Sequence, residues 1–489
     1  MFSRRWDRPA GAGPGHRRAD SFSICESRRS AGRLRSPRFS PVEILCAVAA
    51  VLALIPVWVF RWFPTQDGPS HLYNAVLLAH YQDASSVVIR AYFVPNIRLF
   101  PNWTMFLIMA PLSRVLPPLV VQQIVVTLCV IAIPLAVIYL QKSFKQTTDA
   151  SALIGAALAY SYMLFMGFFN FVLAAAIFAF TVGFWWRRRN DRYWIALYAL
   201  LIATYLSHAL AYAATLLALG VLALLERRWR LFVGLAPAYA LLAFETFVRT
   251  RGTSEYRPIL WHFRKLLDLQ PFVYFGDVHV AIARFMMVML VVAAIFTFVR
   301  RRPHPAAWVS AALFVGYFVA PWGYGAAGWV QGGWINDRLL FLAVLTLPAW
   351  LAVPRPLFAT IVAAIAVLVH FGVTTFEIAG FHRQIGDITR AAALIRPHAT
   401  MQSLVPPFMI SSRGTPLLHV GAYLALRPDV VDLDNYEGRL AYFPILFRAN
   451  VPPQPPNYLV VWSGARVRNV AGYREVFRND AIRLMQRVQ

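Results

Sequence analysis

The sequence is dominated by long apolar segments that follow one another from about residue 42 to residue 376. A helix needs about 20 mostly apolar residues to cross ~30 Å of hydrocarbon. This succession predicts an α-helical polytopic membrane protein with about eleven transmembrane helices. We place them at 42–63, 118–140, 149–166, 168–186, 193–208, 210–225, 230–248, 281–299, 306–321, 337–352 and 356–376.

The composition supports a membrane protein and excludes an ordinary soluble enzyme. Only 14% of the 489 residues are charged and 59% are hydrophobic, whereas soluble domains carry about 25% charged residues. The 47 Lys and Arg exceed the 22 Asp and Glu, which gives a net charge of +25. Such a charge suits either nucleic acid or membranes. Most of the Arg residues lie near the N-terminus and in short loops, so we expect membrane lipids as partners and no nucleic acid.

The basic loops also predict an orientation, because cytoplasmic loops carry the excess of Lys and Arg. Residues 1–40 have the composition of a disordered basic tail, and we place this tail in the cytoplasm. Every short basic loop then falls on the same side, provided that residues 102–117 form an interfacial helix and not a span. These loops carry Lys142 and Lys145, Arg187 to Arg189, Arg227, Arg228 and Arg230, Arg300 to Arg302, and Arg355.

This orientation divides the chain into a cytoplasmic tail at 1–40, a transmembrane domain at 41–376 and an external C-terminal domain at 377–489. The transmembrane domain has two long external loops, 64–117 and 249–280. In the C-terminal part, residues 377–396 have a helical pattern and 458–462 (YLVVW) resemble a strand. We therefore predict a small external α/β domain, periplasmic or extracellular, on a protein of a bacterial inner (plasma) membrane.

The first external loop contains a carboxylate in an unusual position. Asp67 lies in the segment PTQDGPSHLYN (64–74), and His71 follows four residues later. If a helix begins near Pro69, Asp67 has the place of its N-cap. An acid beside a histidine at the membrane surface is equally suited to act as a general base. Both interpretations are open from the sequence.

Further polar residues gather at the predicted outer ends of helices. Singly, each suits a helix cap or an interface contact, but together they line one face of the bundle and form our predicted substrate-binding set. The set comprises Asn170, His208, Glu245, Asp337 and Arg338. His370 lies near the middle of a predicted span, where we expect it to face a neighbouring helix, so the charged midplane signature of a transporter is weak.

The second external loop is basic, although the orientation rule disfavours cations there. A phosphate or pyrophosphate group would explain this charge, since Arg offers a planar fork of donors to phosphate oxygens. Anchoring to lipid head groups is the alternative. The candidate phosphate ligands are Arg249, Arg251, Arg257, His262, Arg264 and Lys265.

This order of loops resembles the GT-C superfamily of polytopic glycosyltransferases, which take sugars from polyprenyl-phosphate carriers at the outer membrane face. The resemblance covers roughly residues 42–376. Asp67 has the place of the essential acid in the first loop, 102–117 that of the interfacial helix and 249–280 that of the second functional loop. Many members carry two adjacent acids in the first loop, whereas Gln66 precedes Asp67 here. A divalent cation therefore stays an open possibility.

The resemblance implies transfer of a hexose or pentose from a polyprenyl-phosphate-linked donor to a glycan, lipid or protein acceptor of the cell envelope. Asp67 would be the general base, His71 would orient it or bind a sugar hydroxyl, and the basic loop would hold the donor phosphate. Two other classes remain. The first is a non-catalytic polytopic protein of envelope-polysaccharide assembly, and the second is a transporter or lipid flippase.

A short acidic run, VVDLDNYEG (430–438), lies in the C-terminal domain together with His419. Its carboxylates suit a hard cation, but the spacing is not that of a calcium loop. We predict an ordinary surface turn here and expect the C-terminal domain to recognise the acceptor.

Overall fold

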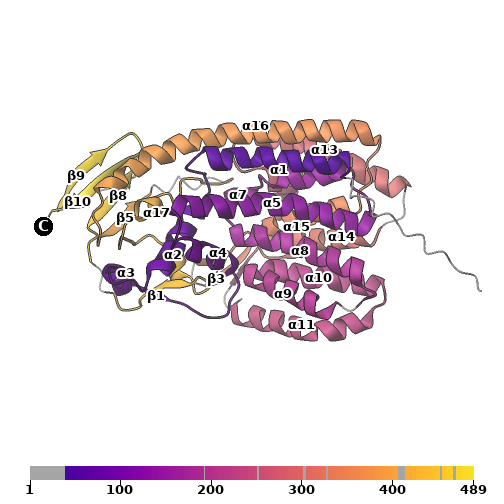
Figure 1. Ribbon diagram of the computed structural model, residues 1–489, viewed down its shortest axis with the longest axis horizontal. Coiled ribbons are helices and arrows are strands. Elements are labelled where there is room, and N and C mark those ends of the chain that lie inside the picture. The colour runs from indigo at the N-terminus through magenta and orange to yellow at the C-terminus, as the bar shows by residue number, and fades with distance from the viewer. Residues whose placement is uncertain are drawn as a thin grey trace, which may run out of the picture. The chain divides into compact units, whose positions relative to one another are not determined.

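Six helices of the computed structural model are long and apolar enough to cross a membrane, counted over the residues that it describes. The described residues are 39–191, 193–249, 253–300, 304–326, 329–405, 413–451, 454–465 and 470–488. Residues 1–38 of the predicted basic tail are therefore not among them. The six helices lie along one another in Figure 1. They are α1 (Pro41–Val59), α5 (Pro118–Lys145), α8 (Phe169–Arg188), α11 (Trp229–Arg249), α13 (Asp277–Arg300) and α16 (Pro356–Thr389).

The other predicted spans are also helical, but they are short or broken. The short helices are α9 (Trp194–Ser207), α10 (Ala209–Leu225), α14 (Pro305–Val319) and α15 (Ile335–Thr346), the last followed by η3 (Leu347–Ala349). The predicted span 149–166 divides into η1 (Ala150–Ala152), α6 (Leu153–Leu158) and α7 (Tyr162–Phe165). The protein is thus polytopic, and the number of crossings stays a prediction because these pieces are shorter than a bilayer requires.

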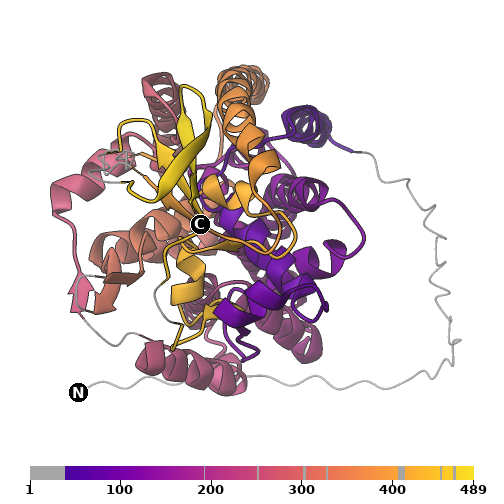
Figure 2. The same ribbon diagram turned by 90° about the vertical axis from the view of Figure 1, so that its left-hand side faces the viewer.

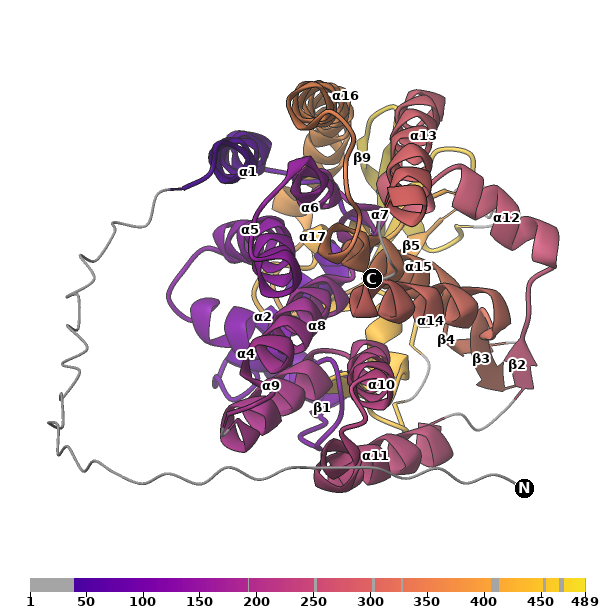
Figure 3. The ribbon, with the colours of Figure 1, turned by 90° about the vertical axis from the view of Figure 1, so that its right-hand side faces the viewer.

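The outer helices expose apolar side chains that a water-soluble protein would bury. Val299 of α13 and Phe376 of α16 are 74% and 76% exposed, while Trp185 of the central helix α8 is fully buried. Figure 3 shows α1, α13 and α16 at the periphery of the bundle and α8 inside it. Extended apolar surfaces of this kind are unfavourable in water, and we infer that they face lipid.

The short basic turns gather at one end of the bundle, as the sequence predicts. Lys142 near the end of α5 pairs with Glu43 of α1 at 2.6 Å. Phe144 stacks on Trp186 near the end of α8, and His304 before α14 packs against both rings. These contacts confirm that the turns share one side. Which side is cytoplasmic stays a prediction.

The first external loop lies at the opposite end of the bundle (Figure 1). It forms α2 (Gly68–His80), α3 (Val87–Tyr92), strand β1 (Phe93–Pro95) and α4 (Thr104–Leu112). Helix α4 is shorter than the predicted helix at 102–117. The amide of Trp103 donates to the carbonyl of Leu206 at 2.8 Å, and the hydroxyls of Thr104 and Ser207 are 2.8 Å apart. The loop is therefore fixed onto the end of α9.

The C-terminal region begins on a continuous helix, because α16 runs past the predicted boundary at 376/377 to Thr389 and continues as η4 (Arg390–Leu394). A five-stranded sheet follows in the order β6-β5-β8-β10-β9. Strand β5 is parallel to its neighbours β6 and β8, and β10 is antiparallel to its neighbours β8 and β9. Its strands are β5 (Thr400–Leu404), β6 (Val431–Asp432), β8 (Tyr458–Trp462), β9 (Tyr473–Arg478) and β10 (Ile482–Arg487). The predicted strand at 458–462 is confirmed.

The first external loop and the C-terminal region are joined by a small sheet and by capping contacts. Strand β1 pairs antiparallel with β7 (Ile445–Phe447). The carboxylate of Asp429 accepts from the amides of Val88 and Ile89 at 2.9 and 2.8 Å and so caps α3. Figure 2, which views this end directly, shows the two regions side by side. Ser40–Gln489 accordingly form one compact unit.

The second external loop forms one short strand and a helix. Strand β2 (Thr253–Glu255) pairs with β3 (Gly323–Ala326), which pairs with β4 (Trp329–Gly332). Helix α12 (Ile259–Leu267) and η2 (Gln270–Phe272) then lead to α13. The loop is thereby attached to the segment that precedes α15.

Cysteine labelling tests the predicted sidedness. In a variant without Cys25, Cys46 and Cys129, we expect a membrane-impermeant maleimide to label Leu99→Cys on intact cells, because Leu99 is exposed in the first external loop. Arg230→Cys at the opposite end should react only after permeabilisation. Labelling of both positions in intact cells would contradict the topology.

Candidate functional site

Asp67 is held where the chain leaves α1 and crosses the break between α7 and α8. The amides of Gln66 and Asp67 donate to the carbonyls of Phe165 and Met166 at 2.9 and 3.2 Å. Gly167 has φ of +81°, and a Cβ there would lie 2.8 Å from the Asp67 nitrogen. Only glycine accommodates both this conformation and this approach, so the turn fixes the backbone of Asp67.

The structure excludes the interpretation of Asp67 as a side-chain N-cap. Helix α2 begins at Gly68, but among the described residues the Asp67 carboxylate makes no capping hydrogen bond to it. The carbonyl of Asp67 accepts from the His71 amide at 3.0 Å instead. The carboxylate is therefore directed to other groups.

His71 forms a buried pair with Glu437, a residue far away in the sequence. The Nδ1 of His71 lies 2.6 Å from Oε1 of Glu437, and their side chains are 7% and 0% exposed. Glu437 belongs to the 3-10 helix η6 (Tyr436–Arg439). The rings of Phe106, Phe169 and Phe443 lie about the imidazole. In such apolar surroundings each charged partner depends on the other.

Two more side chains of the C-terminal region reach Asp67 and its neighbour. His419 Nε2 lies 3.6 Å from Asp67 Oδ1, and the His419 ring stacks on Tyr436 at 4.5 Å. The Gln66 amide donates to Asp67 at 3.3 Å, while its oxygen accepts from the Thr415 amide at 3.1 Å. Gln66 thus ties the C-terminal region to the first loop.

Helix α2 positions η6 through a set of buried polar contacts. The side-chain amides of Asn74 and Asn435 exchange hydrogen bonds at 3.0 and 2.8 Å. The Tyr73 hydroxyl donates to the carbonyl of Val430 and accepts from the amide of Asp432, both at 2.9 Å. Buried polar groups that are all paired specify one arrangement, and here they hold Glu437 against His71.

Burial and neighbouring charges set the protonation of these groups. Burial raises the pKa of Asp67 to about 6, although the charge of His71 opposes that shift. Burial lowers the pKa of His71, but the charge and hydrogen bonding of Glu437 outweigh it and leave the pKa raised. Burial lowers the pKa of His419 to about 3, which keeps that imidazole neutral at physiological pH. At neutral pH a carboxylate and a neutral imidazole therefore meet beside a histidine whose protonated form Glu437 favours.

Helix α12 of the second external loop has its apolar side outward. Leu260 and Leu267 are 76% and 61% exposed, whereas His262 is buried and Lys265 is mostly covered. A helix of this kind suits a membrane interface, where the apolar face contacts lipid. Lipid contact is thus made by apolar side chains, while Lys265 is turned toward the protein.

Lys265 lies near a second acid and several aromatic rings. Its Nζ is 3.9 Å from Asp337 Oδ1 and lies over the rings of Tyr162 and Trp261. Arg338, next to Asp337, lies over the ring of Phe168 at 4.2 Å. Both Tyr162 and Arg338 are within electrostatic reach of Asp67. Lys265 therefore lies beside Asp337, and the charge of Arg338 reaches both Asp337 and Asp67.

The other predicted basic residues do not join this group. Arg257 pairs with Glu255 at 2.9 Å and lies over Trp322, and Arg264 is exposed on α12. Arg251 lies outside the described residues, as does the side chain of Arg249. Of the predicted phosphate ligands whose side chains the structure describes, Lys265 and His262 are those whose charges reach Asp337.

Three predicted substrate-binding residues have structural partners. Asn170, in the first turn of α8, accepts from the Met105 amide at 2.7 Å and donates to the Asn102 carbonyl at 2.8 Å. Glu245 of α11 accepts from the Tyr205 hydroxyl at 2.6 Å. His208 caps α10 by accepting from the Leu210 amide at 3.1 Å, and it lies within electrostatic reach of Arg338. These residues position helices, and a substrate role for them stays a prediction.

The sequence singles out Glu437 and His419 as polar residues of the C-terminal domain but does not place them beside His71 and Asp67. The predicted surface turn at the acidic run is wrong, because Asp432, Asn435 and Glu437 are 5%, 2% and 0% exposed. The available signal was the run itself: several polar residues directly after the apolar pair Val430-Val431 indicate a strand end. Within the described residues, no cluster of three or more His, Cys, Asp or Glu side chains could hold a metal ion.

The fold and the site define a polytopic membrane protein whose outer loop and C-terminal region enclose an acidic and histidine-containing cluster. No known family and no curated protein matches the sequence. Among solved structures, the cryo-EM structure of the arabinofuranosyltransferase AftD from mycobacteria is similar, with a TM-score of 0.47 and 14% identity. The match covers 94% of this chain and 40% of that chain. We therefore infer function from the geometry of Asp67 and its neighbours.

Proposed function

We propose that the protein is a GT-C-type membrane glycosyltransferase. It would move a sugar from a polyprenyl-phosphate carrier to a glycan, lipid or protein acceptor of the cell envelope at the outer membrane face. The observation that carries this proposal is the buried Asp67, whose pKa of about 6 suits a general base near neutral pH. It lies at the ends of apolar helices, where a lipid-linked substrate and a water-soluble acceptor could meet.

In the proposed reaction, an acceptor hydroxyl attacks the anomeric carbon of the donor sugar. The hydroxyl proton passes to Asp67, the new glycosidic bond forms, and the bond between the anomeric carbon and the phosphate oxygen breaks. The lipid phosphate leaves with the electron pair of that bond. Glu437 favours the protonated form of His71, and the charge of that form favours the ionised state of Asp67. His419 has a neutral imidazole 3.6 Å away that is suited to a sugar hydroxyl.

The departing phosphate gains negative charge and needs cations near it. Lys265 and Arg338 are the candidates in this part of the molecule, because both lie close to aromatic rings and to Asp337. Lys265 comes from the basic loop that we propose as the phosphate site. An aromatic, partly dry environment strengthens an ion contact to phosphate.

A transporter is the second candidate, and one observation favours it. The rings of His279 and His370 lie 5.8 Å apart inside the bundle, both 2% exposed, and ionisable pairs at such depth occur in proton-coupled transporters. His370 faces a neighbouring helix as predicted, with Nε2 3.2 Å from the carbonyl of Tyr160. Loss of substrate uptake in cells carrying His370→Phe, with sugar transfer unchanged, would support transport.

The pH dependence of transfer tests the role of Asp67. Since a base must be ionised and the pKa of Asp67 is raised to about 6, we expect kcat/KM to fall as the pH drops through about 6. It should level off above pH 7. The measurement is transfer of a radiolabelled sugar from a polyprenyl-phosphate donor by the protein in proteoliposomes. A profile that stays flat down to pH 5 would contradict the assignment.

A further inference from the structure

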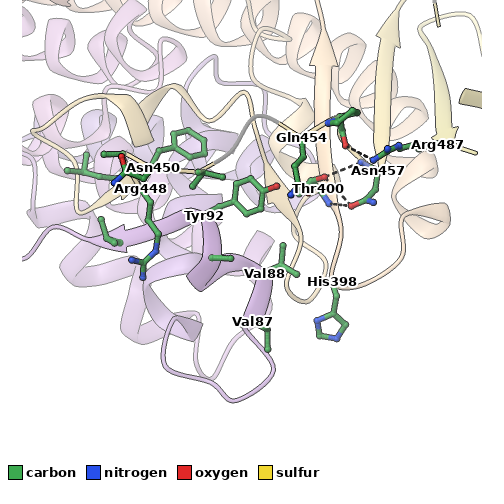
Figure 4. Close-up of a pocket in the computed structure, with 17 residues that line it drawn as sticks. Val87, Val88, Tyr92, His398, Thr400, Arg448, Asn450, Gln454, Asn457 and Arg487 are labelled. Atoms are coloured by element: carbon green, nitrogen blue, oxygen red, sulfur yellow. Dashed lines mark hydrogen bonds between the residues drawn. The ribbon is translucent and has the colours of Figure 1, made fainter. Parts of the chain in front are cut away.

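A cavity of about 790 Å³ opens where α3 and β1 meet the C-terminal region (Figure 4). One wall is formed by α3, and the other by residues 446–451, 454, 455 and 457 and the end of β10. This volume lies within the range of small-molecule binding sites, about 300–1,000 Å³. Asp67 is not among the residues that line it, so the cavity is separate from the proposed reaction centre.

The polar groups of this cavity are mostly amides and cations, together with the side chains of His398 and Thr400. Asn450, Gln454 and Asn457 provide side-chain amides, and Arg448 and Arg487 provide guanidinium groups. The described residues that line the cavity include no carboxylate. This chemistry disfavours a cation and suits a ligand with many hydroxyl oxygens, since amides and guanidinium groups donate to them in defined directions.

Apolar and aromatic surface lies beside these polar groups. Tyr92 and Phe447 contribute rings, and Phe447 is fixed by stacking on Phe93 at 4.5 Å. A sugar ring presents hydroxyl groups at its edge and C–H groups on its faces. A wall that combines rings with amide donors therefore matches both parts of a sugar, and it matches a metal ion poorly.

Two of the polar residues are held in place before any ligand arrives. The Arg448 amide donates to the Tyr92 carbonyl at 2.8 Å, and its Nε donates to the Arg90 carbonyl at 2.7 Å. Asn457 accepts from the Thr400 amide at 2.8 Å. Groups that are already ordered lose little conformational entropy on binding.

One residue that lines the cavity packs against the segment that contains Glu437. A Cβ on Gly438 would lie 2.8 Å from the Phe447 ring, so these residues are in close contact. Gly438 directly follows Glu437, the partner of His71. A ligand in the cavity would thus touch Phe447, which packs against Gly438, the residue next to Glu437.

We propose that this cavity is a carbohydrate-binding site for an oligosaccharide segment, formed jointly by the first external loop and the C-terminal region. Its role as a subsite for the acceptor glycan rests on the proposed function, whereas oligosaccharide binding itself does not. The ligand class is a neutral or acidic oligosaccharide, since the lining carries cations and amides.

The test is binding of the purified full-length protein in nanodiscs to an array of neutral and uronic-acid-containing oligosaccharides of hexoses and pentoses. We expect a subset to bind, and the double variant Asn450→Ala/Gln454→Ala to weaken that binding at least tenfold. Ala91→Trp, which fills the cavity from α3, should abolish binding, and Arg383→Ala on the exposed surface of α16 should not change it.

The outcomes separate this proposal from the proposed function. Absence of binding by the wild-type protein to every oligosaccharide would overturn the cavity proposal, as would equal binding by wild type and both cavity variants. If the wild-type protein binds oligosaccharides through the cavity but shows no sugar transfer, the binding site is supported and the proposed transferase function is contradicted. The unfolding temperature of each variant shows whether a loss of binding reflects a loss of folding.

Discussion

Replacement of Asp67 by Asn should lower the rate of sugar transfer by about 10²–10⁴-fold, which is the usual contribution of a general base. The amide keeps the shape of the carboxylate but accepts no proton. Because burial disfavours the ionised carboxylate, the variant should be at least as stable as the wild-type protein at pH 7. Activity would be measured with a labelled polyprenyl-phosphate sugar in proteoliposomes, and stability by thermal unfolding in detergent.

Loss of activity with unchanged stability in Asp67→Asn would mean that Asp67 acts in the reaction and not in folding. Asp387→Asn is the matched control, since Asp387 lies on α16, is half exposed and pairs with Arg390. We expect it to leave transfer unchanged. Full transfer by a well-folded Asp67→Asn protein would remove Asp67 from the mechanism. If assembly of an envelope polysaccharide complex persisted while no transfer could be detected in the wild type, the non-catalytic assembly role would be favoured.

Loss of Glu437 should have the largest effect on stability. Removal of one partner from a buried ion pair costs about 3–5 kcal/mol, and Glu437 is fully buried against His71. We therefore expect Glu437→Ala to lower the unfolding temperature strongly in a thermal assay. Glu437→Gln keeps the side-chain volume and should retain enough folded protein for kinetic measurements.

The pH profile of Glu437→Gln tests whether Glu437 is a positioning residue for catalysis. Without the carboxylate, the pKa of His71 falls, because only Asp67 and a backbone hydrogen bond to Gly167 then oppose the effect of burial. Asp67 in turn loses the positive charge of His71, which lowers its pKa more than the Glu437 charge raises it. The acidic limb of kcat/KM should then move above pH 6. An unshifted limb in a less stable protein would mean a structural role only. Glu475→Gln at the exposed pair with Arg478 should change neither property.

The helices could be predicted from the sequence because the signal is local. A continuous apolar segment such as 118–140 has one stable form in a bilayer, and α5 covers it entirely. The break within 149–166 has a less visible cause, namely Ser161, whose hydroxyl accepts from the Leu164 amide and starts α7 anew. Since serine also occurs within helices, this cap could not be recognised without the tertiary structure.

Only the part of the candidate site that lies in the first long loop could be predicted from the sequence. Asp67 and His71 are close in sequence and stand out between Pro and Gly residues, so both could be identified. Glu437 and His419 could not, because their place depends on the pairing of β1 with β7 and on contacts between side chains such as Asn74 and Asn435. Pairing over such separations leaves no local pattern, and the acidic run therefore resembled a surface turn.

The joining of the first external loop to the C-terminal region has a consequence for biosynthesis. Ser70 and Asn435 are 365 residues apart in the chain, and ribosomes add roughly 5–20 residues per second. The first loop must therefore wait roughly 20–70 s after its own synthesis before its partner segment exists. During that interval His71 and Asn74 lack their partners, so a nascent chain would expose them to water or to a chaperone. Packing of this region is thus completed only after the C-terminal region has been synthesised.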